Sequence, residues 1–211
     1  MSPTSSVASL PAVRALGEPY RAQAIRQDGV ATASQLVTWG YSRSLVARRV
    51  EGGQWQRLFP GVVALQSGPV SWRQRARGGL LYSGRDAALS HRPAAFHRRV
   101  LPDPGPSIVV VIPHDRRVDP QPGLVVHRRR DMPWAGGGLR AVDAEEAVLC
   151  LAAEAATDDA LVGLVCDAVR GGVGADVLLR RAARRTRLRN RRLLAEVLGA
   201  VADGIESPLE L

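Results

Sequence analysis

Arginines and small polar side chains occupy the stretch from residue 42 to residue 57, and together they suit contact with nucleic acid. Guanidinium groups make paired hydrogen bonds to guanine edges and phosphates, and serine and alanine leave room for close approach to a groove. The residues in this stretch that we expect to bind DNA are Ser42, Arg43, Ser44, Ala47, Arg48, Gln54 and Arg57. Their spacing alone fits the solvated face of an ordinary helix equally well.

A helix is expected to position most of these side chains. Ser42 has the side chain of a helix N-cap, and a glycine pair after Glu51 ends the helical pattern. If Val46 and Val50 turn toward a core, successive rotations of about 100° bring a second set of residues to the opposite face. That outward set is Ser44, Ala47, Arg48 and Glu51, with Arg43 at its edge.

A β-hairpin is expected immediately after this helix. Strand-favouring residues at 55–59 and 62–65 flank a turn at Pro60 and Gly61. Gln54 and Arg57 would then lie where the hairpin runs along the DNA backbone beside the groove. The hairpin therefore makes DNA binding a better interpretation of the helix than a solvated face.

Two further helical patterns precede the helix and hairpin, at Tyr20 to Gln27 and Ala33 to Trp39. Three helices followed by a hairpin indicate a winged helix-turn-helix, which we expect over residues 18–66. Trp55 is assigned a structural role, as the core aromatic that fixes the hairpin to the third helix. Residues 1–17 are rich in Ser, Pro and Ala, and we expect them to be a disordered leader.

The remainder of the chain is expected to contain two more parts. Residues 67–142 are interpreted as a small α+β middle domain, with a helical stretch at 70–96 broken near Gly84 and strands at 108–112 and 124–127. Residues 143–211 are expected to be a helical C-terminal region. Its predicted helices are Asp143 to Ala155, Asp158 to Arg170, Ala175 to Arg185 and Asn190 to Ala202. The predicted fold class is therefore α+β.

Charge is strongly positive and unevenly distributed. The net charge is +9, which favours a polyanionic partner such as double-stranded DNA. Every basic residue other than histidine is arginine, which we attribute to a biased genome composition. The segment from Arg140 to Asp176 is acidic, whereas Arg180 to Arg192 contains eight arginines and no acid. These arginines have three alternative roles: to contact phosphate, to bind an acidic partner, or to pair with the acidic helices before them.

Other polar residues give weaker signals. Candidates for additional contact with the DNA backbone are His91, Arg92, His127 and Arg128. The four histidines have neither the spacing of metal ligands nor thiolates beside them, so we predict no metal site and no cofactor. No segment has the roughly 18 apolar residues that cross a bilayer, and no secretory signal pattern is present. We therefore expect a cytoplasmic protein with no membrane partner.

The run QDGVATASQLVTWGYSRSLVARRVEGGQWQRLFPGVVAL, residues 27–65, resembles the N-terminal winged-helix domain of the AbiEi family of type IV toxin-antitoxin antitoxins. The likeness continues through LSHRPAAFH, IVVVIP and GLVVHRRRDM, and it covers most of residues 27–155. It implies a bacterial transcriptional regulator that represses its own operon. It also implies a C-terminal part that counters a cognate nucleotidyltransferase toxin.

The C-terminal end departs from that outline. The sequence GIESPLEL, residues 204–211, resembles the start of a very-short-patch-repair-like endonuclease domain, in which Glu206 or Glu210 would lie in the first helix. No later Asp and Glu-x-Lys pair follows to hold a metal ion, so we predict no nuclease activity and no enzyme.

Three functional hypotheses follow from these observations. The first is a sequence-specific DNA-binding transcriptional regulator. The second is the N-terminal targeting half of a truncated DNA endonuclease, and the third is an interaction module that binds a toxin through its helical tail.

Overall fold

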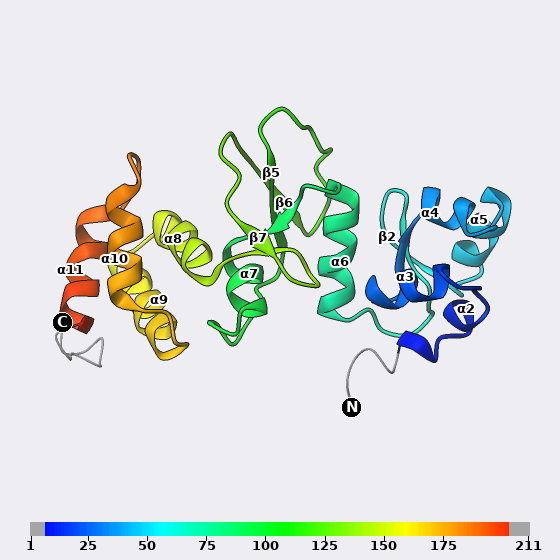
Figure 1. The fold of residues 1–211 in the computed structure, drawn as a ribbon, viewed down its shortest axis with the longest axis horizontal. Coiled ribbons are helices and arrows are strands. Elements are labelled where there is room, and N and C mark those ends of the chain that lie inside the picture. The colour runs from blue at the N-terminus through cyan, green and yellow to red at the C-terminus, as the bar shows by residue number, and fades with distance from the viewer. Residues whose placement is uncertain (1–6, 203–211) are drawn as a thin grey trace. The chain divides into compact units, whose positions relative to one another are not determined.

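A computed structural model describes residues 7–202 of the chain, and its architecture is mixed α+β with two sheets (Figure 1). The described residues fall into two compact units. Unit 1 contains residues 7–87 and 112–130, and unit 2 contains residues 88–111 and 131–202. The expected middle domain at 67–142 is therefore divided between the two units.

Unit 1 contains the helices and hairpin that the sequence predicts before residue 66. Its elements are α2 Pro11–Arg14, α3 Tyr20–Arg26, β1 Val30–Thr32, α4 Ala33–Thr38, α5 Arg43–Glu51, β2 Gln56–Phe59, β3 Val62–Ala64, α6 Trp72–Ser83 and β6 Leu124–Arg129. The predicted helices at 20–27, 33–39 and 43–51 are confirmed to within one residue, and so are both hairpin strands. The strand β1 was not expected from the sequence.

A three-stranded antiparallel sheet joins β1 to the hairpin, in the order β1-β3-β2. Val30 pairs with Ala64 and Thr32 pairs with Val62, so β3 lies in the middle. Thr32 also begins α4, because its hydroxyl accepts a hydrogen bond from the Gln35 N–H while the Gln35 side chain bonds back to the Thr32 N–H. This capping box fixes the point at which the chain leaves the sheet and enters α4.

The structure corrects the expected disordered leader for residues 7–17, and residues 1–6 lie outside the described residues. Residues Pro11–Arg14 form α2, and Val13 and Leu16 are buried in the same core cluster as Leu36 and Trp55. The guanidinium of Arg21 donates to the backbone carbonyls of Arg14 and Leu16 and so ties this segment to α3. Two apolar residues three positions apart are enough to bury one face of a single turn, although they give too short a pattern to predict.

Asp28 attaches α6 to the rest of unit 1. Its side chain is buried in the α3–β1 turn, with its carboxylate oxygens 2.5 Å from Arg73 Nε and 3.0 Å from Arg77 Nη2. Gln74 donates to the Asp28 backbone carbonyl at 3.1 Å. Burial lowers the pKa of the Arg77 guanidinium, and the neighbouring Asp28 carboxylate opposes that shift. The Asp28 carboxylate and the Arg77 guanidinium thus compensate each other's charge where α6 meets the α3–β1 turn.

Unit 2 combines a small sheet with a set of helices. Its elements are β4 Ala88–Leu89, α7 His91–His97, β5 Ile108–Pro113, β7 Ala135–Gly136, β8 Ala141–Val142, α8 Ala144–Glu154, α9 Asp158–Arg170, α10 Ala175–Arg184 and α11 Arg191–Ala202, and the last two residues of β5 count with unit 1. Within unit 2 the strand order is β5-β4-β8-β7, with β4 and β8 parallel and the other neighbours antiparallel.

The helical C-terminal region follows the prediction closely. Asp143 and Thr157 accept hydrogen bonds from the third residues of α8 and α9, as N-cap side chains do. Each of the four helices lies within one residue of its predicted bounds. By contrast, the predicted helical stretch at 70–96 is interrupted by β4 as well as by the break near Gly84.

The Asp28 contacts generate a stability prediction. Asp28→Ala leaves two guanidinium groups beside an apolar interior without their carboxylate, so it should lower the free energy of unfolding by about 3 kcal/mol. Urea denaturation followed by circular dichroism measures the change. Asp115→Ala, which removes an exposed carboxylate from the same unit, is the control and should change it by less than about 0.5 kcal/mol. Equal effects of the two substitutions would contradict the assigned role of Asp28.

Candidate nucleic-acid interface

Local hydrogen bonds define both ends of α5. At its start the Leu45 N–H donates to the Ser42 hydroxyl oxygen at 3.2 Å, which confirms Ser42 as the N-cap. At its end the N–H groups of Gln54 and Trp55 both donate to the Arg49 carbonyl, at 2.9 and 3.0 Å. Ser42 therefore caps the start of α5, and backbone hydrogen bonds from the following loop cap its end.

The inner face of α5 packs against the unit 1 core. Val46 and Val50 contact the buried cluster that includes Leu36 and Trp55. Trp55 is 4% exposed, and its ring meets Tyr41 edge to face at a centroid distance of 5.2 Å. The predicted structural role of Trp55 and the predicted inward orientation of both valines are confirmed. Because these contacts fix the rotation of α5, they also fix which residues face outward.

The outer face of α5 carries the predicted set. Ser42, Arg43, Ser44, Ala47 and Arg48 are all exposed. Within the described residues, no side chain forms a hydrogen bond or an ion pair with the guanidinium of Arg43 or Arg48. The single acid of the helix is Glu51, in its last turn. The result is an exposed, positively charged helix face with small residues at its N-terminal half, which suits approach to a phosphate-lined groove.

Arg57 lies on β2, the edge strand of the hairpin. It pairs with Val63, and directly opposed residues of an antiparallel pair point to the same side of a sheet. Val63 belongs to the core cluster on which Val46 and Val50 pack. Arg57 is exposed, so its side chain leaves the sheet on the face that packs on this core cluster. The hairpin that carries Arg57 and the inner face of α5 are therefore both placed by the same core cluster of unit 1.

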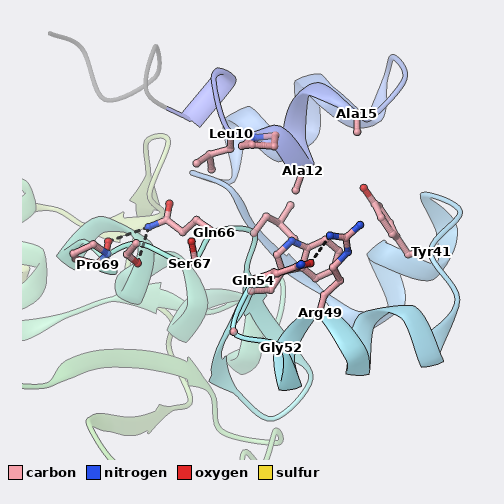
Figure 2. Close-up of a pocket in the computed structure, with 15 residues that line it drawn as sticks. Leu10, Ala12, Ala15, Tyr41, Arg49, Gly52, Gln54, Gln66, Ser67 and Pro69 are labelled. Atoms are coloured by element: carbon pink, nitrogen blue, oxygen red, sulfur yellow. Dashed lines mark hydrogen bonds between the residues drawn. The ribbon is translucent and has the colours of Figure 1, made fainter.

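Gln54 is not part of that set. It lies in the loop between α5 and β2, where its side-chain oxygen accepts a hydrogen bond from Arg49 Nη1. Arg49 is about 100° around the helix from Arg48, and both Arg49 and Gln54 line a cavity together with Tyr41 (Figure 2). Sequence reasoning did not single out Arg49. The available signal was its position next to Arg48, because neighbouring residues of a helix lie on different faces.

The additional candidates for backbone contact have different surroundings. His91 is buried, with its Nε2 atom 3.1 Å from a Glu154 carboxylate oxygen, so its side chain is not placed for contact with a phosphate. Arg92 is exposed and lies 3.8 Å from the Asp103 carboxylate. His127 and Arg128 lie on β6 in unit 1, and only Arg128 is fully exposed.

Some arginines of the C-terminal region pair with acids of the same unit. Arg181 Nη1 lies 2.8 Å from an Asp143 carboxylate oxygen, and Arg185 Nη2 lies 2.5 Å from Glu146. For Arg181 and Arg185 the structure shows the third alternative, pairing with acids of the preceding segment. These two ion pairs account for part of the segregation of charge without a ligand.

Glu206 and Glu210 lie outside the described residues. None of the helices between residues 7 and 202 is long and apolar enough to cross a membrane. Comparison with protein-family models matches no family, and comparison with curated proteins matches no relative.

The ion pairs of α8 and α10 generate a second stability prediction. Arg185→Ala leaves the Glu146 side chain, which is 12% exposed, without its guanidinium. We expect the free energy of unfolding to fall by about 2 to 3 kcal/mol. The neighbouring Arg184 is exposed, and within residues 7–202 its guanidinium has no ion pair, so Arg184→Ala should have almost no effect. Urea denaturation of both variants checks the difference, and equal losses would show that the pair with Glu146 does not stabilise unit 2.

Proposed function

We propose that this chain is a sequence-specific DNA-binding transcriptional regulator and that residues 18–66 are its winged helix-turn-helix. The observation that supports the proposal best is the outer face of α5, where Arg43, Ser44, Ala47 and Arg48 are exposed and the guanidinium groups of Arg43 and Arg48 have no internal partner among the described residues. Arg57 is exposed on the hairpin that follows. A helix that enters the major groove needs small residues for close approach and arginines for guanine edges and phosphates.

The order of the elements also supports this proposal. Helix α3, strand β1, helices α4 and α5, and then the β2-β3 hairpin follow one another in the chain, and the sheet order is β1-β3-β2. In the proposed winged helix-turn-helix, α5 takes the position of the recognition helix and the β2-β3 hairpin takes the position of the wing. The turn of this wing is only Pro60 and Gly61, and the Gly61 carbonyl accepts a hydrogen bond from the Ala33 N–H at 2.8 Å. Such a short wing reaches phosphates beside the groove rather than bases along it.

The proposed contacts differ in kind. Arg48 points away from the core on α5 and is proposed to read a guanine, whereas Arg57 on the edge strand is proposed to bind phosphate. Arg43, at the edge of the exposed face, suits either role. The resemblance to AbiEi antitoxins supports repression of the chain's own operon, with a cognate toxin as a second, protein partner.

Binding to DNA should depend strongly on salt. Two or three arginine contacts to phosphate release counterions, so affinity should fall about ten- to fortyfold between 50 and 200 mM salt. The duplex is obtained by selection from a randomised pool with the whole chain, and fluorescence anisotropy measures the affinity at each salt concentration. Failure to bind any duplex at 50 mM salt would refute the proposed function.

Single substitutions should separate base reading from phosphate binding. Arg48→Ala should weaken binding to the selected duplex by about 1 to 3 kcal/mol and leave binding to a scrambled duplex nearly unchanged. Arg57→Ala should weaken both. The control is Arg26→Ala, which removes an exposed charge from α3. If Arg48→Ala changes neither affinity while the variant remains folded by circular dichroism, α5 is not the recognition helix.

A further inference from the structure

Unit 1 contains a cavity of about 700 Å³ next to the C-terminal end of α5 (Figure 2). One wall comes from the α2 segment, through Leu10, Ala12 and Ala15, and the other from α5, the loop after it and the end of the hairpin. This size lies within the range of small-molecule sites, which is roughly 300 to 1,000 Å³. None of the proposed DNA-contacting arginines of α5 and β2 lines this cavity.

Most of the cavity surface is apolar. Leu10 and Ala12 of the α2 segment line it together with Trp55 and Leu65 of the core and Pro69 of the following loop. Trp55 and Leu65 are themselves buried, so they form a fixed base. Such a surface suits the body of an aromatic or branched aliphatic ligand.

One group of polar side chains lies at the α5 end of the cavity, while Gln66 and Ser67 line it elsewhere. Arg49, Gln54 and Tyr41 line the cavity, and the Arg49 guanidinium donates to the Gln54 amide oxygen (Figure 2). No carboxylate within the described residues pairs with Arg49. Burial raises the pKa of the Tyr41 phenol, so this hydroxyl stays protonated near neutral pH and able to donate a hydrogen bond. A cation and a hydroxyl donor therefore adjoin an apolar surface.

We propose that this cavity binds a small organic monocarboxylate with an apolar body. The carboxylate would take a charge-assisted hydrogen bond from Arg49 in place of the neutral amide of Gln54, and the body would contact Trp55 and Leu65. Among the described residues that line the cavity, Arg49 is the only charged one, which favours a ligand with one negative charge over a di- or triphosphate. This site is independent of the proposed DNA binding, because its ligand contacts neither Arg48 nor Arg57.

Direct binding of probe acids to the whole chain tests the proposal. The probes are phenylacetate, indole-3-acetate and octanoate, and the neutral analogue phenylacetamide is the ligand control. Isothermal titration measures affinity, and the indole N–H signals of the four tryptophans in a nitrogen-15 NMR spectrum report the location. We expect at least one acid to bind, to shift the Trp55 signal most, and to bind at least about tenfold more tightly than its amide.

Three variants make the outcome decisive. Arg49→Gln should weaken the acid about tenfold or more without changing the affinity for phenylacetamide, whereas Arg26→Gln, which removes an exposed charge from α3, should leave both unchanged. Ala12→Leu should weaken acid and amide alike, because it fills the cavity. Thermal melting confirms that each variant is folded. If none of the acids binds, or if the acid binds Arg49→Gln as tightly as the original chain, the proposal is wrong.

Discussion

Packing of Val46 and Val50 against buried Trp55 and its core cluster is the constraint on which the proposed interface depends. These side chains pack against the cluster that contains Leu36 and Trp39, and they fix the rotation of α5. Removal of a large aromatic ring from such a core leaves a cavity and typically costs about 3 to 5 kcal/mol. Arg43 and Arg48 can remain exposed and free of internal partners among the described residues because the inner face alone holds the helix in place.

Ion pairs with nearby acids are a second constraint, because they separate arginines with a structural role from the exposed arginines of α5. In unit 2, Arg181 and Arg185 are committed to carboxylates of α8, and in unit 1, Arg73 and Arg77 are committed to Asp28. Among residues 7–202, no acid forms an ion pair with Arg43 or Arg48 on the outer face of α5. A net charge of +9 therefore says little by itself about where a polyanion binds, and the pairing of individual arginines says much more.

Local patterns made much of this structure predictable from the sequence. N-caps such as Ser42, glycine stops and helical spacing define α5 and the C-terminal helices, and the same spacing predicts which residues of α5 face outward. Pairings between distant segments were not predictable. Asp28 and Arg73 are 45 residues apart, and β4 and β8 have only two residues each, too few to show an alternating pattern. The hydrogen bond from Arg49 to Gln54 was not predictable either, because it depends on how the loop after α5 turns.

The most direct test of the account is to map the surface that DNA contacts on the intact chain. Nitrogen-15 NMR spectra recorded during titration with a selected duplex would show which backbone amides change. The account predicts the largest changes in residues 42–51 and at Arg57 on β2, with little change in α10 and α11. Largest changes among the arginines between 180 and 192, with residues 42–51 unaffected, would contradict it.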